Sequence, residues 1–331
     1  MAKADNPLQE VQLRVQSLVS NVAASWSDLR NKGPANLQLQ MPVIQMPAFR
    51  PEKKDGPKVK GLGKLMYKED PPELMECYDL ERQFDMEGAA GCYRQALDKH
   101  GQKNKVGREA KGRLSKQLSD MGWQCYSHSQ KFPVVRTAKP QPGTYQQGGE
   151  FINEAMRVSD EVMKEHPNWA RAHLATAVNY GRLALYSDNK TKVSLCDKVK
   201  EEAEEAIRLN PNDDMAWHCL GRWNYEVANV NPVVKVVMKH WYGGDISATY
   251  ADAIHHYSKA AAIAPTRPHH QYELAKVQLK MGNRDTAIAT MHKALEYEVE
   301  DINAELGRLH VLLMLEKLGK SKNVSTEKLF K

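Results

Sequence analysis

The sequence NPNDDMAWHCLGRWNY, residues Asn210 to Tyr225, decides the fold of this chain. A residue before proline avoids the α-helical conformation, so one helix ends at Asn210, and Asn212 or Asp213 can cap the next. The next helix carries a large anchor and small contacts on one face, namely Trp217, Leu220 and Gly221. This arrangement is typical of the first helix of a repeated helical hairpin.

The spacing expected of a second helix recurs downstream at a fixed offset. Small, aromatic, small and helix-breaking residues follow one another at Ala253, Tyr257, Ala260 and Pro265. The same spacing returns 34 residues later at Ala287, Met291, Ala294 and Val299, with valine in place of the expected proline. Upstream, Ala177 and Tyr180 fall at the small and aromatic positions of the pattern, counted from Pro167 as Trp217 is counted from Pro211. A weaker set lies at Ala89, Tyr93 and Ala96.

That offset is the period of tetratricopeptide repeats. We therefore predict an all-α solenoid of tetratricopeptide-type helical hairpins. The residues expected to pack inside the repeats are Trp217, Leu220, Gly221, Tyr257, Ala260, Ala287 and Ala294.

Composition and pattern divide the chain into an amphipathic helix (1–32), a Pro- and Lys-rich linker (33–72), the repeat domain with insertions between its helices (73–320) and a tail (321–331). In the first region, apolar residues recur at steps of three and four between Leu8 and Leu29. That stripe predicts either a helix docked on the repeats or a homodimeric coiled coil through residues 8–29.

The linker carries seven prolines, which deny it a regular helix, and an excess of cations. The cations include Arg50, Lys53, Lys54, Lys58 and Lys60. A second basic stretch runs from Lys99 to Lys116. An extended cationic segment is attracted to a polyanion over about 10 Å at ordinary salt. The alternative is a solvated spacer.

Within the repeat domain we expect helices at residues 73–84, 86–99, 106–126 and 151–166, with a loop at 132–149. Two insertions lengthen the hairpins. Residues 182–192 add about ten residues, and residues 229–249 add about twenty and hold a short helix. Insertions in a solenoid form loops on one face.

The five cysteines show no CxxC pair and fall mostly on helical faces, so we expect small buried apolar residues in a reducing compartment. No apolar run approaches the roughly 18 residues of a membrane span. Asp5 and Glu10 make the start unlike a secretory signal or a transit peptide. These features favour a cytoplasmic protein.

The run Leu220 to Ala228, followed after the insertion by Ala248-Thr249-Tyr250, resembles the regulator of microtubule dynamics family. The resemblance covers roughly residues 73 to 320. It implies a soluble or membrane-anchored repeat protein that associates with microtubules and the mitotic spindle, with a membrane-anchored relative at organelle contacts. Two features depart from the family: the helix near Arg113 to Leu118 lacks a tryptophan, and the N-terminal extension has no anchor.

First helices line the groove of such a solenoid at fixed positions. Counting from Trp217, fifteen lining positions in three repeats contain five Arg or Lys and one acidic residue, Glu226. The candidate partner-binding residues are Arg171, Arg182, His218, Arg222, Tyr225, Tyr272, Lys276 and Lys280. A basic, aromatic-flanked groove suits an acidic extended peptide or an anionic head group, and the alternative is an ordinary solvated face. We expect neither Arg222 nor Lys276 to be core.

Catalysis finds no support in the sequence. The pairs His255-His256 and His269-His270 point to different helix faces, so we expect no metal site, no cofactor and no catalytic residue. We expect a non-enzymatic cytoplasmic scaffold, associated with the cytoskeleton and spindle, that binds tubulin or microtubules and acidic peptides but no nucleic acid. The alternative is a lipid-binding or organelle-contact tethering module of the same fold.

Overall fold

The structure of this protein is a computed structural model that describes residues 71–319, except 102, 133, 136, 137, 238, 241, 242, 244–246 and 300. The predicted N-terminal helix, the linker cations Arg50 to Lys60 and the C-terminal tail lie outside the described residues. The helices are η2 (Pro72–Leu74), α2 (Met75–Arg82), α3 (Met86–His100), α4 (Lys105–Ser129), α5 (Tyr145–Glu165), α6 (Ala170–Leu185), α7 (Asn189–Leu209), α8 (Asp214–Ala228), α9 (Pro232–Val237), α10 (Tyr250–Ile263), α11 (Pro268–Lys280), α12 (Arg284–Ala294) and α13 (Ile302–Lys317).

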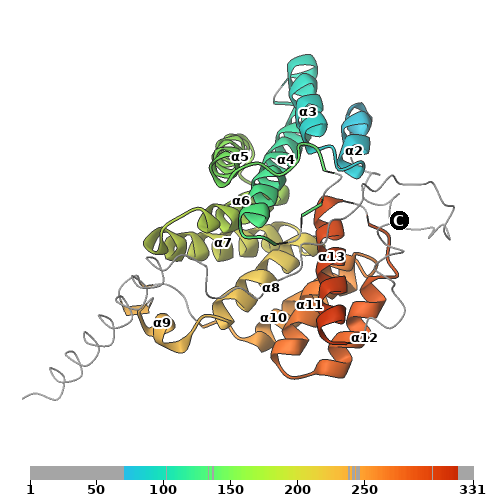
Figure 1. The fold of residues 1–331 in the computed structure, drawn as a ribbon. Helices are drawn as coiled ribbons and strands as arrows, with labels where there is room; N and C mark the ends of the chain where they lie inside the picture. Colours follow the sequence, from blue (N-terminus) through green and yellow to red (C-terminus); the bar gives the residue numbers. More distant parts are fainter. Residues whose placement is uncertain are drawn as a thin grey trace, which may run out of the picture. The chain divides into compact units, whose positions relative to one another are not determined.

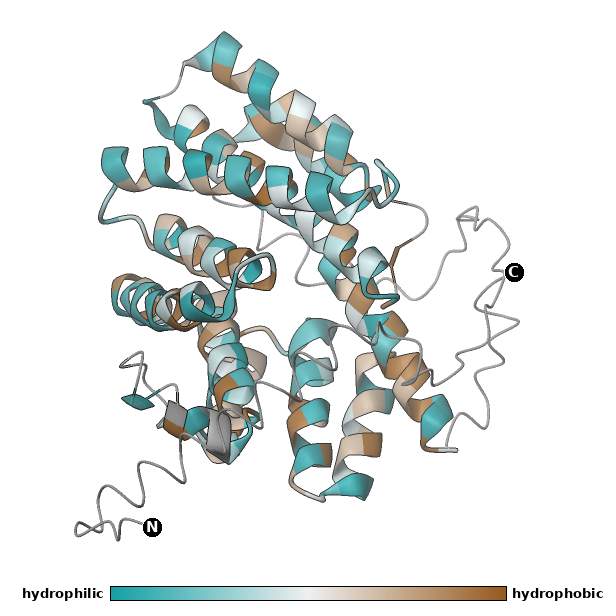
Figure 2. Ribbon diagram, turned by 60° about the vertical axis from the view of Figure 1, so that its left-hand side comes forward, coloured by the Kyte–Doolittle hydropathy of each residue, from teal (hydrophilic) through white to brown (hydrophobic). Residues whose placement is uncertain are grey.

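The helices pack as successive hairpins, α2 with α3, α4 with α5, α6 with α7, α8 with α10 and α11 with α12, and α13 follows (Figure 1). Within the described ranges the only strand-like feature is an isolated bridge between Asp85 and Lys139. Teal and brown residues alternate along most helices in Figure 2, as expected for helices with one buried face. The all-α, tetratricopeptide-type fold is therefore confirmed.

The close approach of α8 and α10 depends on Gly221. A Cβ atom added at this position would lie 2.9 Å from the ring of Tyr257, which is fully buried. Gly122 on α4 approaches Ile152 on α5 in the same way, with a Cβ distance of 2.5 Å. The other small and apolar packing residues are also buried, namely Leu220, Ala260, Ala287 and Ala294.

Trp217 lies between α8 and α10, but only half-buried. Its indole N–H donates to the carbonyl oxygen of Pro211 at 2.9 Å, and its ring stacks on His256 with 5.8 Å between ring centroids. The fully packed tryptophan of this hairpin is Trp223, which donates to the carbonyl oxygen of Cys196 at 2.8 Å. Trp217 therefore covers the edge of the core and does not fill its centre.

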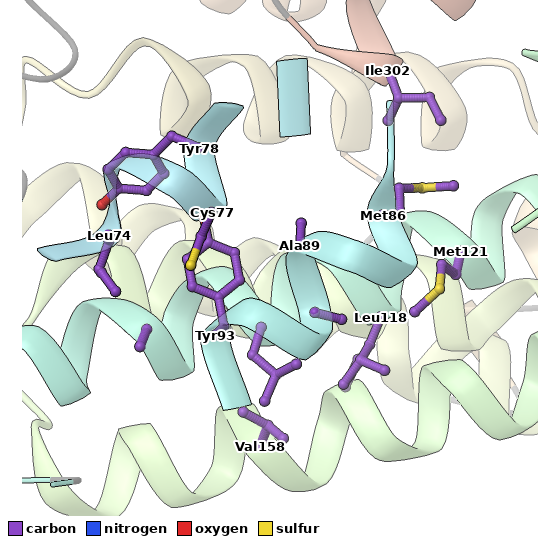
Figure 3. Close-up of a cluster of buried hydrophobic side chains, with 14 of the residues drawn as sticks. Leu74, Cys77, Tyr78, Met86, Ala89, Tyr93, Leu118, Met121, Val158 and Ile302 are labelled. Atoms are coloured by element: carbon purple, nitrogen blue, oxygen red, sulfur yellow. The ribbon is translucent and has the colours of Figure 1, made fainter. Parts of the chain in front are cut away.

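The hydrophobic core consists of separate clusters along the array. The largest joins α2, α3, α4 and α5 and includes Tyr78, Tyr93 and Leu118 (Figure 3). Ile302 from α13 belongs to the same cluster, although it lies far away in the sequence. Other clusters join α6, α7 and α8 around Trp223, and α11, α12 and α13 around Met291.

Two predicted loops are shorter than expected, because helices occupy part of each. The extra residues at 182–192 extend α6 to Leu185 and start α7 at Asn189, where the side chain of Asp188 accepts a hydrogen bond from the backbone N–H of Thr191. Helix α5 begins at Tyr145 and not near residue 151, because Thr144 and Gln147 form a capping box. The second insertion does hold a short helix, α9.

The expectation that all five cysteines are unpaired is wrong. Cys77 on α2 and Cys92 on α3 form a disulfide, with 5.4 Å between their Cα atoms. The two helices form a hairpin that brings the two positions face to face, which spacing in the sequence does not reveal. Cys125, Cys196 and Cys219 are free.

Among the described residues, no helix is both long enough and apolar enough to span a membrane.

Candidate functional site

Four of the five first helices of the hairpins, α4, α6, α8 and α11, contact one another in this order, and we call the surface that they share the inner face. All eight predicted partner-binding residues lie on three of these helices: Arg171 and Arg182 on α6; His218, Arg222 and Tyr225 on α8; Tyr272, Lys276 and Lys280 on α11. The structure brings the residues of α8 and α11 together and places Arg182 in a separate cluster with α4. Whether this set binds a partner stays a prediction.

Glu273 on α11 organises the contact between α8 and α11. Its side chain is 2% exposed and forms ion pairs with Arg222 Nη1 at 3.0 Å and Lys276 Nζ at 2.8 Å. Burial by itself raises the pKa of this carboxyl, but the attraction of Lys276 and Arg222 lowers its pKa to about 2. The ammonium of Lys276 also lies 4.5 Å from the ring centroid of Tyr225, a cation–π contact.

Arg222 and Lys276 are only partly buried, as expected of residues outside the core, but their ion pairs link both of them to it. Both cations compensate a buried carboxylate, and Arg222 forms a second ion pair with Glu226 at 2.8 Å. The side chain of Arg222 remains 40% exposed at its outer edge. Reversing either charge would leave the buried Glu273 with a single compensating cation and would place a like charge beside it.

Asp120 on α4 organises a second cluster. Its side chain is 1% exposed, and its partners are Lys116 at 3.0 Å and Arg182 at 2.7 Å. The side-chain amide of Asn303, at the start of α13, donates to Asp120 at 3.1 Å. Burial raises the pKa of Asp120, but Lys116 and Arg182 overcome this effect and lower it to about 2. Arg182 is therefore neutralised inside the protein.

The remaining two predicted cations differ from each other. Arg171 pairs with Glu109 of α4. Lys280 is exposed at the end of α11. Of the five groove cations, four thus have carboxylate partners in the structure.

His218, His269 and His270 meet at the contact between α8 and α11. The Nδ1 atoms of His218 and His270 are 3.0 Å apart, and Nε2 of His270 is 2.7 Å from a carboxylate oxygen of Asp214. With neutral rings, His270 donates through Nε2–H to Asp214 and accepts at Nδ1 the proton of His218. The ring of His269 meets His218 edge-on at 4.4 Å between centroids.

Burial lowers the pKa of all three imidazoles, most strongly that of His218, because a protonated ring would lose its hydration. Arg222, Arg267 or both lie near each ring, and their positive charge lowers its pKa further. The pKa of His269 falls to about 4. Within the described ranges no group of His, Cys, Asp or Glu side chains is arranged to hold a metal ion. The cluster is a neutral packing element between repeats.

Helix α13 crosses the inner face. At its start, Asp301 lies 3.7 Å from Lys116, and Asn303 accepts from Arg182 at 3.3 Å. Further along, the ring of His310 stacks on Tyr272 with 5.4 Å between centroids. Two of the predicted partner-binding residues, Arg182 and Tyr272, are therefore in contact with α13, the last helix of the described residues.

The basic stretch from Lys99 to Lys116 divides in two. Lys111 pairs with Glu165 at 2.7 Å, and Arg113 lies between Glu81 and Glu109, so the second half is internal. In the first half, Lys99, Lys103 and Lys105 are exposed at the turn between α3 and α4, and no carboxylate of the described residues forms an ion pair with them. We call these three lysines the basic corner.

The acidic partners of these cations do not stand at the lining positions that the repeat pattern predicts: Glu273 lies beside such a position on α11, and Glu109 and Asp120 lie on α4, outside the three repeats. Glu273 stands one residue after the lining position Tyr272 and three before Lys276, a helical ion-pair spacing that was readable. Asp120 and Asn303 are 183 residues apart, and no sequence pattern joins them.

Comparison with known proteins gives a consistent picture. The family model described as "Regulator of microtubule dynamics protein 1-3" matches residues 85–319. Regulator of microtubule dynamics protein 1 of Bos taurus is 27% identical over 157 residues, which are 47% of this chain and 50% of that protein. Regulator of microtubule dynamics protein 3 of Mus musculus is 30% identical over 107 residues, 32% of this chain and 23% of that protein.

The chain thus spans about half the length, or less, of these relatives. A solved structure, a thermophilic TPR protein of Thermus thermophilus, aligns with a TM-score of 0.47 and 18% identity, over 72% of this chain and 95% of that one. The family model covers more than two thirds of the sequence, and the chain belongs to the regulator of microtubule dynamics protein 1-3 family.

Proposed function

We propose that this chain is a non-catalytic helical-repeat scaffold that associates with microtubules through cations outside the inner face. The observation that carries the proposal is the basic corner, since Lys99, Lys103 and Lys105 are exposed and unpaired within the described ranges. A microtubule presents an acidic surface, which attracts such a group at a distance. The names of the relatives, regulators of microtubule dynamics, support this class of partner.

The linker adds to this attraction in the proposal. It precedes the repeat domain in the sequence, and its cations Arg50, Lys53, Lys54, Lys58 and Lys60 belong to a proline-rich segment. Diffuse contacts of this kind weaken gradually as salt rises. Residues 8–29 would increase avidity if they form a homodimer, because two basic corners would then bind one lattice.

Acidic-peptide binding by the inner-face cations is a separate proposal, and the ion pairs of Glu273 limit which cations are available for it. An incoming carboxylate must share Arg222 and Lys276 with the buried Glu273, which already compensates both. Lys280 and the outer edge of Arg222 are the cations still accessible to such a peptide. Cytoplasmic, cytoskeletal and spindle localisation likewise follows in this proposal from microtubule association.

The lipid-binding alternative receives no specific support. A hollow between α3, α4 and α5 has a volume of about 170 Å³, below the roughly 300 Å³ of typical ligand pockets. Its lining includes the charged side chains Arg94, Lys111 and Glu154, and Arg94 pairs with Glu154 at 2.8 Å. A charged hollow of this size does not suit an acyl chain.

Co-sedimentation with polymerised tubulin over a series of salt concentrations tests the proposed function. We expect the full chain to pellet at low salt and to dissociate progressively as salt rises. Reversal of Lys53, Lys54, Lys58 and Lys60 to Glu should weaken the association and flatten its salt dependence. A full chain that stays in the supernatant at low salt would overturn microtubule association.

A further inference from the structure

One disulfide and a few side-chain contacts hold α2 on the array. Cys77 and Tyr78 of α2 lie in the first core cluster (Figure 3), and the disulfide joins Cys77 to Cys92 of α3. Glu81, near the end of α2, accepts a hydrogen bond from the hydroxyl of Tyr93 on α3. An isolated helix of eight residues is marginal in water, so α2 depends on these links.

The turn between α2 and α3 is fixed by contacts that do not involve α2. The backbone N–H of Lys139 donates to the carbonyl oxygen of Phe84 at 2.9 Å, and the N–H of Glu87 donates to that of Lys139 at 3.0 Å. The side chain of Asp85 caps α3 by accepting from the N–H of Gly88. A local opening that frees α2 therefore ends at this turn and leaves α3 in place.

The disulfide is accessible from the α3 side. Cys77 is 1% exposed, whereas Cys92 is only partly buried, and a Cβ added at the neighbouring Gly91 would meet no atom within 4 Å. In thiol–disulfide exchange a thiolate attacks one sulfur of the bond, and here the Sγ atom of Cys92 is the one within reach.

Reduction by a dithiol proceeds in two exchange steps. Attack on Cys92 forms a mixed disulfide with the reductant, and Cys77 leaves as a thiolate that takes a proton from water. The second thiol of the reductant then attacks the reductant's own sulfur in the mixed disulfide and releases Cys92. Two electrons and two protons thus pass from the dithiol to the cysteine pair, and the reductant becomes a disulfide.

We propose that the Cys77–Cys92 disulfide is a redox-sensitive latch: a dithiol reductant opens it, and α2 then separates from α3 while the other hairpins stay folded. Disulfides of cytoplasmic proteins are usually transient or redox-sensing, which fits the localisation proposed above. A bond that spans 15 residues suppresses such an opening by about a hundredfold or more. The latch does not involve the basic corner, so failure of microtubule association leaves the inference standing.

Opening of the latch changes the charge of the inner face. Glu81 pairs with Arg113 at 3.7 Å and with Lys116 at 3.4 Å, both on α4. When α2 separates, Arg113 keeps its pair with Glu109 and Lys116 keeps its pair with Asp120, but each loses one carboxylate. The reduced protein therefore has a more positive inner face than the oxidised protein.

Hydrogen exchange of the full chain tests the latch, with dithiothreitol as the reductant and no denaturant. Alkylation by iodoacetamide, followed by peptide mass spectrometry, reports the state of each cysteine. We expect reduction to make Cys77 and Cys92 reactive and to speed exchange of the α2 amides about a hundredfold, while α4 and the later helices exchange as before.

Two variants complete the experiment. Cys77→Ser combined with Cys92→Ser should show the fast exchange of α2 without any reductant. Cys196→Ser removes a free cysteine on α7 instead, and its α2 should exchange as slowly as that of the oxidised native chain.

Three results would overturn the latch. In the first, iodoacetamide labels Cys77 and Cys92 in protein purified without reductant, so there is no disulfide to open. In the second, dithiothreitol reduces the pair only after urea has unfolded the chain, so the bond is out of reach in the folded protein. In the third, reduction leaves α2 exchange unchanged or abolishes cooperative unfolding of the whole chain, so the bond does not control α2 alone.

Discussion

The inner face and the basic corner carry similar positive charge in the sequence but differ in what they can bind. On the inner face, Arg222 and Lys276 flank a carboxylate that is 2% exposed. At the basic corner, the side chains of Lys99, Lys103 and Lys105 are exposed and form no ion pair within the described ranges. A count of cations along a sequence therefore does not measure the charge available to a partner. Only the spatial neighbours of each cation decide that.

The largest expected effect comes from reversing charge on the inner face. Arg222→Glu combined with Lys276→Glu would surround the buried Glu273 with like charges, so we expect a loss of at least about 5 kcal/mol of unfolding free energy. Urea denaturation followed by circular dichroism measures it. Lys99→Glu with Lys103→Glu is the control and should unfold like the native protein. A double variant of native stability would show that Glu273 is not compensated as described.

Two tryptophans of α8 sharpen the comparison between interior and edge. Trp223→Ala removes a buried ring and should cost about 3 to 5 kcal/mol, whereas Trp217→Ala removes a half-buried one and should cost roughly 2 kcal/mol. Thermal and urea unfolding of both variants give the order. Equal costs would place Trp217 deeper in the core than the structure does.

Acidification should weaken the α8–α11 contact through its histidines. Their folded-state pKa values are lowered, so the unfolded state binds more protons once the pH falls below the ordinary value of 6.5. The contribution of the neutral histidines to stability is fully present above pH 6.5. It falls as the pH drops toward about 4, where His269 becomes protonated in the folded protein.

Below pH 6.5 the free energy of unfolding should fall by about 1.4 kcal/mol per pH unit for each histidine that is neutral in the folded protein and protonated in the unfolded chain. Urea titrations at pH 7, 6 and 5 measure it, and His270→Gln should reduce the slope. The carboxylates Glu273 and Asp120 act at lower pH, since their folded-state pKa values of about 2 make stability fall only below about 4.5. A flat stability between pH 7 and 5 would contradict the buried neutral cluster.

The smallest effects concern two glycines, one with open space around it and one at a close contact between two helices. Gly91 on α3 has no atom within 4 Å of an added Cβ, so Gly91→Ala should stabilise the protein by about 0.5 to 1 kcal/mol. Gly221→Ala should destabilise it by roughly 1 to 3 kcal/mol, because its Cβ would meet Tyr257 at 2.9 Å. Differential melting measurements compare the two. The same sign for both variants would refute the close approach of α8 and α10.

The hairpins could be predicted from the sequence because small residues recur at a fixed spacing, as Ala260 and Ala294 do. The site could be predicted only in part. The lining positions of α8 and α11 do meet, but the pairing of Arg222 with Glu273 joins residues 51 apart in the sequence. The disulfide of Cys77 with Cys92 depends on how α2 and α3 pack within one hairpin, and the contacts of α13 with α4 and α6 depend on how successive hairpins stack. Such contacts between distant residues leave no local pattern to read.

The most direct test of the account compares two triple variants in co-sedimentation with polymerised tubulin at one low salt concentration. The first carries Lys99→Glu, Lys103→Glu and Lys105→Glu at the basic corner. The second makes the same change in charge at exposed lysines on other helices, Lys190, Lys259 and Lys293. The account predicts a several-fold weaker association for the first variant and near-native association for the second. Equal association of both variants with that of the native chain would contradict it.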